Sequence, residues 1–244
     1  MESVSRCVRE MKRNKTTSPE QIAGWLGRNE PFPISHERIY QHIHMDRDRG
    51  GLLHTHLRQQ KRPKRISSKT AYRGSIPHRV SIDDRPALVE EKTRIGDGEV
   101  DLMMGGHGGG GRLTLVDRKI RFTRIQPVLS KHADHIADVI IEALSEMKNQ
   151  VHTLTVDNGN EFAQHKRVAK ALQAKVYFAH PYCARERGLN ENTNGLFRQY
   201  LPKGTNFKRV TQANIRPAEN RLNDRPRKSL EFRSPNDIFQ HGKP

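Results

Sequence analysis

The sequence predicts an α/β fold in which helices flank a mixed five-stranded sheet, preceded by a small helical domain. Three observations predict this organisation. Strand-like and helix-like segments alternate in the C-terminal part, a basic stretch without apolar periodicity interrupts the chain, and two short helical segments precede that stretch. We therefore expect a helical domain over residues 1–48, a basic linker over 49–90 and an α/β core over 91–244.

The charge of the chain points to a polyanionic partner. Its 244 residues include 44 Lys and Arg but 27 Asp and Glu, a net charge of +17, and nucleic acid is the default partner for such a surplus. No apolar run approaches the ~18 residues needed to span a bilayer, so no membrane association is expected. With two cysteines and no apolar segment in residues 1–15, we expect no disulfide framework, no secretory signal and a reducing cytoplasm.

The first region contains two predicted helices with good N-terminal signals. Ser18, Pro19 and Glu20 supply an N-cap, a first-turn proline and an early acid, and Ser35 caps the next helix. Helical spacing also appears earlier, at Val4, Val8 and Met11. Two short helices with a tight connection suggest a helix-turn-helix that reads the DNA major groove through polar residues of its second helix: His36, Arg38, Gln41 and His42. An ordinary helical hairpin is the alternative.

The linker is uniformly basic. Residues 49–82 contain nine Lys or Arg and no acid, with the highest density at Lys61, Arg62, Lys64 and Arg65. Such a stretch favours contact with DNA phosphates, and a solvated loop without a partner is the alternative.

The C-terminal region alternates between periods of two and of 3.6 residues. Three strands joined by short turns should form an antiparallel meander, followed by helices that alternate with two further strands. The expected strands are 99–104, 113–116, 121–128, 151–156 and 175–179, and the expected helices are 133–147, 161–174 and 190–200. This order, βββαβαβα, is that of the ribonuclease H-like fold.

Three acids stand out by position. Asp101 lies inside the first strand, Asp157 ends the fourth strand, and Glu191 begins the late helix. A carboxylate in an apolar strand is costly unless it is paired or bound to metal, and carboxylate oxygens suit Mg²⁺ or Mn²⁺. Two such ions activate a nucleophile and stabilise the leaving oxygen of a phosphodiester. Strand-end acids are also common in turns, however, and spacing alone leaves other candidates: Asp97, Glu99 and Glu161.

Three blocks of sequence resemble the catalytic blocks of insertion-sequence 30 family transposases, within the integrase and D-D-E transposase superfamily. They are residues 96–102, 155–162 and 187–200, and the 33 residues between Asp157 and Glu191 match the spacing of that family. Residues 222–228 resemble its terminal block, and residues 18–26 resemble its second helix-turn-helix.

The resemblance implies a function. Asp101, Asp157 and Glu191 would hold two Mg²⁺ (or Mn²⁺) ions, water would free a 3′-hydroxyl at an element end, and that hydroxyl would attack target DNA. Double-stranded DNA, as terminal inverted repeats and target, would be the partner, with a homo-oligomer bringing two ends together in the nucleoid of a bacterial cytoplasm. Arg198 and Lys203 would hold phosphates near the site, and a solvated helix face is the alternative for both.

The sequence also departs from the family pattern. An additional N-terminal DNA-binding region usually precedes residues 18–26, so a truncated chain is expected. Gly98 replaces an expected Trp, and residues 180–187 replace a stretch that begins with Asp and contains Ser-Pro-Trp-Gln. Two alternatives therefore stay open: a catalytically decayed DNA-binding remnant that represses transposition, and a structure-specific nuclease of the same fold.

Overall fold

A computed structural model of the chain describes residues 17–31, 33–57, 76–106, 108–181 and 183–241. The chain divides into two compact units, one formed by Thr70–Asn223 and one by Met1–Lys69 together with Asp224–Pro244. The helix expected around Val4 to Met11 lies outside the described residues, as do the four predicted phosphate contacts of the linker: Lys61, Arg62, Lys64 and Arg65.

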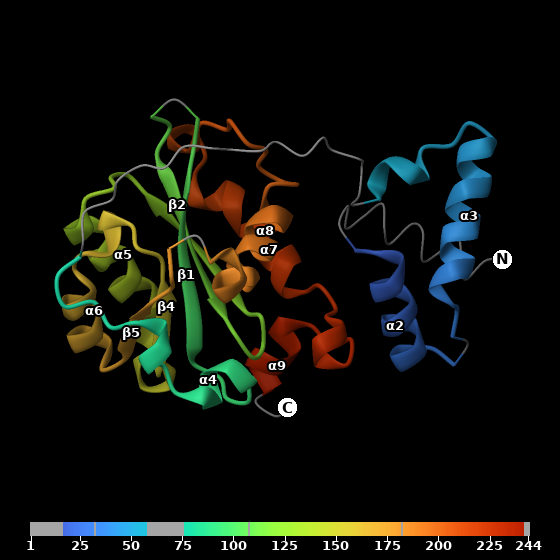
Figure 1. The fold of residues 1–244 in the computed structure, drawn as a ribbon. Helices are drawn as coiled ribbons and strands as arrows, with labels where there is room; N and C mark the ends of the chain where they lie inside the picture. The colour runs from blue at the N-terminus through green and yellow to red at the C-terminus, as the bar shows by residue number, and fades with distance from the viewer. Residues whose placement is uncertain (1–16, 32, 58–75, 107, 182, 242–244) are drawn as a thin grey trace. The chain divides into compact units, whose positions relative to one another are not determined.

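The larger unit is built on one five-stranded sheet with the strand order β3-β2-β1-β4-β5. Its strands are β1 (Asp97–Met104), β2 (Gly111–Asp117), β3 (Thr123–Val128), β4 (Thr153–Val156) and β5 (Lys175–Phe178). The first three strands form the expected antiparallel meander, whereas β4 and β5 run parallel to β1 (Figure 1). The predicted mixed five-stranded sheet is therefore confirmed.

Helices cover both faces of this sheet (Figure 1). Val100 of β1 is fully buried in an apolar cluster with residues of α5 (Ala133–Leu144) and α6 (His165–Leu172). Met103 of the same strand belongs to a second cluster with residues of α7 (Gly188–Phe197) and α8 (Gln212–Asn223). Because side chains alternate along a strand, the odd-numbered residues of β1 face α7, among them its three acids: Asp97, Glu99 and Asp101.

Some elements differ from the sequence-based prediction. The helix expected over 161–174 is divided into a short turn and α6, and α7 begins two residues earlier than expected, at Gly188. Ile76 and Val89, inside the expected linker, are buried against the larger unit. The unit also contains α4 (Ala87–Glu91) and short 3-10 segments: η2 (Ile82–Asp84), η3 (Ser145–Gln150), η4 (Asn160–Phe162), η5 (Ala184–Arg187) and η6 (Phe207–Arg209).

The turn between β1 and β2 needs its glycines because it packs closely against other backbone. The N–H of Gly105 donates to the carbonyl of Gly110 at 2.9 Å, and Gly110 has a positive φ of 72°. A Cβ added to Gly106 would lie 2.7 Å from the carbonyl oxygen of Gly204, which leaves no room for a side chain. The glycines therefore allow this turn to pack against the segment that follows α7.

The smaller unit contains α2 (Pro19–Asn29), α3 (His36–Asp48) and η1 (Leu53–His56). The Ser18 hydroxyl accepts from the N–H of Gln21, and the Gln21 side chain accepts from the N–H of Ser18, so the predicted N-cap is a capping box. The two helices pack through a small apolar cluster: Ile22, Leu26, Ile39, Ile43 and Leu53.

The C-terminal segment of the chain packs on α2. The Gln21 amide donates to the carbonyl of Pro226 at 2.8 Å, and Lys228 forms an ion pair with Glu20 at 2.6 Å. A Cβ on Gly24 would lie 2.3 Å from the ring of Phe232, so a glycine is needed for this contact. This segment contains η7 (Lys228–Leu230) and α9 (Pro235–His241).

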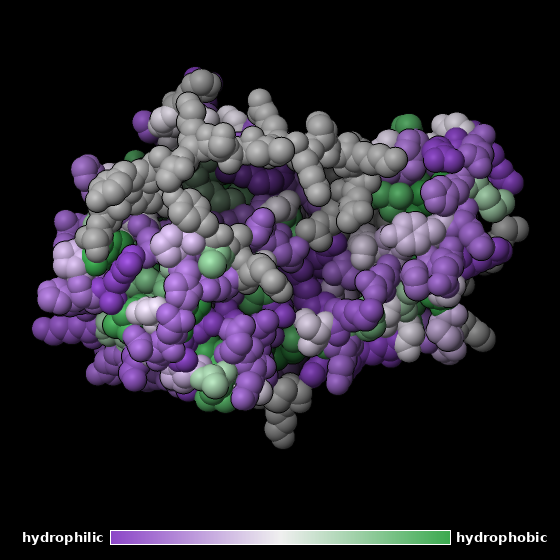
Figure 2. Space-filling model, in the orientation of Figure 1, coloured by the Kyte–Doolittle hydropathy of each residue, from purple (hydrophilic) through white to green (hydrophobic). Residues whose placement is uncertain are grey.

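Hydrophilic residues predominate on the visible face of each unit (Figure 2), in keeping with the net charge of +17. Among the described residues, none of the helices combines the length and the apolar character needed to cross a bilayer.

Candidate active site

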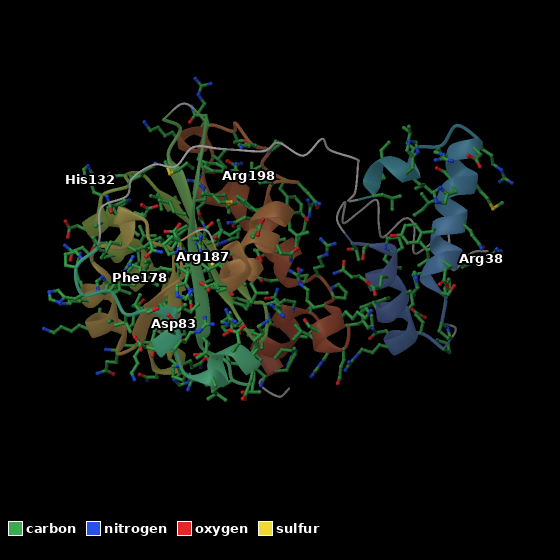
Figure 3. The ribbon with its side chains drawn as sticks, in the orientation of Figure 1. Arg38, Asp83, His132, Phe178, Arg187 and Arg198 are labelled. Carbon is green, nitrogen blue, oxygen red and sulfur yellow. The ribbon has the colours of Figure 1, made fainter. Side chains whose placement is uncertain are left out.

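Two of the predicted acids are joined by one arginine. Nη1 of Arg187 donates to Oδ1 of Asp101 at 2.7 Å, and Nη2 of the same guanidinium donates to Oδ2 of Asp157 at 3.4 Å. All three side chains are partly open to solvent, with exposed fractions of 22% for Asp101, 24% for Asp157 and 20% for Arg187. Figure 3 shows Arg187 beside β1. The two carboxylates thus share a single positive charge.

Strand register brings Asp101 and Asp157 together. Strands β1 and β4 are parallel neighbours that pair Asp97 with Thr153 and Glu99 with Thr155. The same register, continued two residues further, places Asp157 opposite Asp101. The Asp157 carboxylate also accepts the N–H of Gly159 at 2.8 Å, so the Asp-Asn-Gly sequence forms a turn while one carboxylate oxygen faces Arg187.

Asn194 of α7 orients the Asp101 carboxylate. Its Nδ2 donates to Oδ2 of Asp101 at 2.6 Å, and its Oδ1 accepts from the hydroxyl of Thr114 at 3.0 Å. Thr114 is fully buried on β2, directly opposite Asp101 in the antiparallel register. Asp101 is therefore held on one side by a chain of hydrogen bonds that ends at the buried Thr114 and on the other by Arg187.

Glu191 lies between Arg187 and Asn194 in the sequence, in the first part of α7. Residues three positions apart share a helix face, and Glu191 precedes Asn194 by three. Glu191 therefore lies on the side of α7 from which Asn194 contacts Asp101. Its side chain is exposed, and within the described part of the chain no group of three acidic, histidine or cysteine side chains is arranged as a metal site.

Glu99 has a different environment from Asp101. It forms a buried ion pair with Arg118 at 2.6 Å and accepts the backbone N–H of Asn190 at 3.1 Å. Asn190 lies in the first turn of α7, where backbone N–H groups have no acceptor within the helix. The Glu99 carboxylate supplies an acceptor for one of these N–H groups. Burial raises the pKa of the Glu99 carboxyl despite the nearby guanidinium. Glu99 therefore fixes the position of the helix that carries Arg187, Glu191 and Asn194.

The other two acids that spacing left open also lie apart from the Arg187 cluster. Asp97 is fully buried. Its carboxylate accepts hydrogen bonds from Nε and Nη2 of Arg94 at 2.8 and 2.9 Å, and from the hydroxyl of Thr153 at 2.7 Å. Glu161 does not contact Arg187 in any described hydrogen bond, but it lies in the turn after Asp157, with its carboxyl group against Gly159, and it lines a small cavity with residues of α5 and α6.

The chain was compared with known proteins at the levels of sequence and structure. It is 47% identical to the transposase for insertion sequence element IS4351 of Bacteroides fragilis over 93% of this chain and 70% of that protein. It is 34% identical to transposase InsI for insertion sequence element IS30A of Escherichia coli (strain K12), over 92% of this chain and 61% of that protein. No protein-family model matches the chain.

The chain belongs to the insertion-sequence 30 family of transposases. The family resemblance expected from the sequence blocks is thereby confirmed. The chain spans 70% of the length of the first relative and 61% of that of the second.

The fold of this transposase family member is also found in a solved structure of low sequence identity. A chain of the simian T-cell lymphotropic virus intasome, solved in complex with PP2A regulatory subunit B56 gamma, aligns with a TM-score of 0.51 and 14% identity, covering 84% of this chain and 73% of that chain. The ribonuclease H-like architecture predicted from the element order is confirmed.

Two residues of this transposase family member were predicted to bind DNA near the site, Arg198 and Lys203, and only the second is exposed. Arg198 donates to the carbonyls of Met104 at 3.0 Å and Pro202 at 3.4 Å, and its guanidinium lies 5.2 Å from the centre of the Phe207 ring. Its donors are therefore directed at the protein's own backbone. Lys203, in the segment after α7, is exposed.

Three of the four predicted DNA-reading residues of the smaller unit are exposed on α3: His36, Arg38 (labelled in Figure 3) and Gln41. The fourth, His42, is half-buried. Nη1 of Arg38 donates to the Gln41 side chain at 3.3 Å. This surface is available to a partner.

Sequence analysis assigned no specific role to Arg187 or to the Glu99–Arg118 pair. Arg187 lies inside the last family block, and its position one helical turn before Glu191 was a usable signal. Arg118 gave none, because an arginine after a strand is ordinary in a chain with 44 basic residues. The side chain of Asn190 is buried without a hydrogen-bond partner among the described residues, and nothing in the structure explains it.

Proposed function

We propose that the chain catalyses metal-dependent DNA cleavage and strand transfer at the ends of its own insertion sequence. The observation that carries this proposal is the meeting of Asp101 and Asp157 at the interior strands β1 and β4, where both carboxylates bind the same cationic group. Membership of a transposase family supports the reaction class.

The residues at this site fit a divalent metal. Asp101, Asp157 and Glu191 offer only carboxylate oxygens, which are the donors that Mg²⁺ and Mn²⁺ prefer. Arg187 already supplies a positive charge between two of them, which indicates that this position favours a cation. Two bound ions would lower the pKa of an attacking hydroxyl and stabilise the leaving oxygen of a phosphodiester.

The chain's own residues position these donors. Thr114 and Asn194 fix the orientation of Asp101, and Glu99 holds the start of the helix that carries Glu191. The reaction then follows in two displacements at phosphorus. Water breaks a phosphodiester and frees a 3′-hydroxyl, and this hydroxyl attacks a target phosphodiester and releases a second 3′-oxygen. No covalent bond to the protein is required.

Double-stranded DNA is the proposed partner of both units. Residues of α3 would read the terminal inverted repeats: His36, Arg38 and Gln41. Basic residues of the linker and the core would hold phosphates: Lys61, Arg62, Lys64, Arg65, Arg198 and Lys203. Because strand transfer joins two ends to one target, we propose that the chain acts as a homo-oligomer on DNA, at the nucleoid of the bacterial cytoplasm.

The departures from the family pattern leave the acids in place. Gly98 alternates with Glu99 on β1, and a Cβ on it would lie 3.1 Å from Leu154, a member of the α5–α6 cluster. The missing Trp therefore falls on the face of the sheet opposite Asp101. The altered stretch 180–187 ends in Arg187, which contacts two of the three acids. These positions support an active enzyme over a decayed remnant.

A strand-transfer assay tests the proposal. The full chain is incubated in Mg²⁺ with a pre-cut duplex taken from the DNA that flanks its own coding sequence, and joining to a plasmid is measured. We expect joined product from the wild type and none from Asp157→Asn. Binding without metal-dependent joining or nicking would indicate the repressor alternative, whereas nicking of any branched duplex without joining would indicate a structure-specific nuclease.

A further inference from the structure

The guanidinium of Arg187 occupies the place between Asp101 and Asp157 that a metal ion would require. Its two contacts are unequal, at 2.7 Å to Asp101 and 3.4 Å to Asp157. A charge-assisted N–H···O bond is ordinarily about 2.7–2.9 Å long, so the bond to Asp157 is weak. The group also keeps an exposed fraction of 20%, which lets water and other anions reach it.

The backbone around Arg187 leaves room for the side chain to move. Arg187 is the N-cap of α7, at the junction with η5, and has non-helical backbone angles (φ −124°, ψ 33°). The next residue is Gly188, where an added Cβ would meet no atom within 4 Å among the described residues. Among the described residues, no side chain therefore packs against the start of α7 at this position.

A DNA phosphate is the natural competitor for this guanidinium. Arginine binds phosphate through two parallel N–H bonds, in the same forked geometry that it uses for carboxylates. Any phosphodiester that reacts beside Asp101 and Asp157 must come close to Arg187, because Arg187 touches both.

We propose that Arg187 is a displaceable counter-ion that excludes divalent metal from Asp101 and Asp157 until a DNA phosphate draws it away. This inference rests on the proposed metal-dependent function. It makes Arg187 a positioning residue that couples DNA binding to metal loading. Since coupling between two ligands is reciprocal, metal should also tighten the binding of DNA.

Direct measurement of metal binding tests the coupling. Mn²⁺ is titrated into the full-length protein, free Mn²⁺ is followed by electron paramagnetic resonance, and the titration is repeated with a short blunt duplex. We expect duplex to raise the Mn²⁺ affinity of the wild type about 10-fold, within the range usual for coupled sites. Arg187→Gln should bind Mn²⁺ about 10-fold more tightly than wild type without DNA, and duplex should then add little.

Two variants serve as controls, and a third covers a failure to fold. Arg79→Gln removes a nearby exposed arginine, which donates to Asn158 at 2.7 Å but not to the acids, and should behave as wild type. Asp101→Asn should abolish tight Mn²⁺ binding. Arg187→Lys keeps the charge without the fork and should lie between wild type and Arg187→Gln, and it decides the question if Arg187→Gln does not fold.

The outcomes separate this inference from the proposed function. Equal or weaker Mn²⁺ binding by Arg187→Gln, with binding abolished in Asp101→Asn, would overturn the role of Arg187 and leave the metal site standing. Absence of Mn²⁺ binding in every variant, with and without duplex, would overturn the metal site and the inference with it.

Discussion

Glu99 and Asp101 lie two residues apart on the same face of β1, and each is paired with an arginine. The Glu99–Arg118 pair is almost fully buried, with exposed fractions of 1% and 3%. The Asp101–Arg187 pair keeps exposed fractions of 22% and 20%. One strand thus carries a closed ion pair and an open one, each beside the same helix, α7.

The comparison indicates that burial decides whether an ion pair is fixed or can exchange its partners. Arg118 also donates to Glu90 at 2.9 Å and to the carbonyl of Val89 at 3.2 Å, so its guanidinium is held by several acceptors. A buried charge that loses its partner is strongly destabilising, so this pair cannot open during a reaction. The Asp101 carboxylate can change partners, because solvent reaches both members of its pair.

The largest expected effect on strand transfer comes from the three solvent-accessible acids of the candidate active site. Asp101→Asn, Asp157→Asn and Glu191→Gln should each lower strand transfer at least about 1,000-fold, equivalent to about 4 kcal/mol of transition-state stabilisation. Their unfolding midpoints in urea should stay near wild type. Asp138→Asn, which changes an exposed acid of α5 that pairs with Arg167, is the control and should keep its activity. A full-strength reaction from any of the three variants would contradict their assignment.

Substitutions in the buried Glu99–Arg118 pair should mainly lower the stability of the protein. Glu99→Gln removes the buried charged partner of Arg118 and leaves only Glu90, whose side chain is 66% exposed, so the free energy of unfolding should fall by about 3 kcal/mol, measured by urea denaturation. The double variant Glu99→Leu with Arg118→Met removes both charges and should recover much of that loss. A single variant as stable as wild type would mean that the pair does not anchor α7.

The elements on either side of this comparison were predictable to different degrees. The strands were readable from alternation, whereas Asp101 and Asp157 were chosen from several acids through the resemblance of their sequence blocks to a transposase family. Sequence alone did not distinguish Glu99 from Asp101, because both face α7 and differ only in what covers them. That cover is provided by Arg118 and by the first turn of α7, which come from distant parts of the chain.

The less regular parts were harder to predict. The helix α8 was not predicted, because it contains an internal proline, Pro217, and is rich in polar residues. Residues 76–90 were assigned to the linker because the basic stretch that precedes and overlaps them lacks apolar periodicity, yet Ile76 and Val89 are buried in the larger unit. Bridging by Arg187 was not predictable, because it depends on the register between β1 and β4.

A smaller effect is expected from Asn194, which links Asp101 to the buried Thr114 of β2. Asn194→Ala removes the bonds to Asp101 and Thr114, so strand transfer should fall about 10- to 100-fold, as for other residues that orient a metal ligand. The free energy of unfolding should fall by only about 1 kcal/mol. Gln199→Ala, an exposed amide shortly after α7, is the control. Equal losses in both variants would show that Asn194 does not orient Asp101.

The smallest expected effect concerns an ion pair that is still more open than that of Asp101. His180 lies between Glu186 at 2.7 Å and Asp83 at 2.9 Å, and its side chain has an exposed fraction of 42%. Hydrogen bonds to Glu186, and next to Asp83, raise the pKa of His180 above its ordinary value. These contacts close the loop that leads to Arg187, since Glu186 is the preceding residue.

The sign of the pH dependence follows from that raised pKa. A histidine that holds its proton more tightly when folded contributes its full stabilisation below the unfolded value of about 6.5, and loses it as pH rises through the folded pKa. The melting temperature of wild type should therefore exceed that of His180→Gln by most near about pH 6, and the difference should vanish above the folded pKa. Thermal unfolding followed by circular dichroism at successive pH values measures this difference. His44→Gln, which removes an exposed histidine from α3 of the smaller unit, is the control. A difference that is constant with pH would show that the charge of His180 does not hold the loop, and that exposure this large leaves an ion pair without measurable effect.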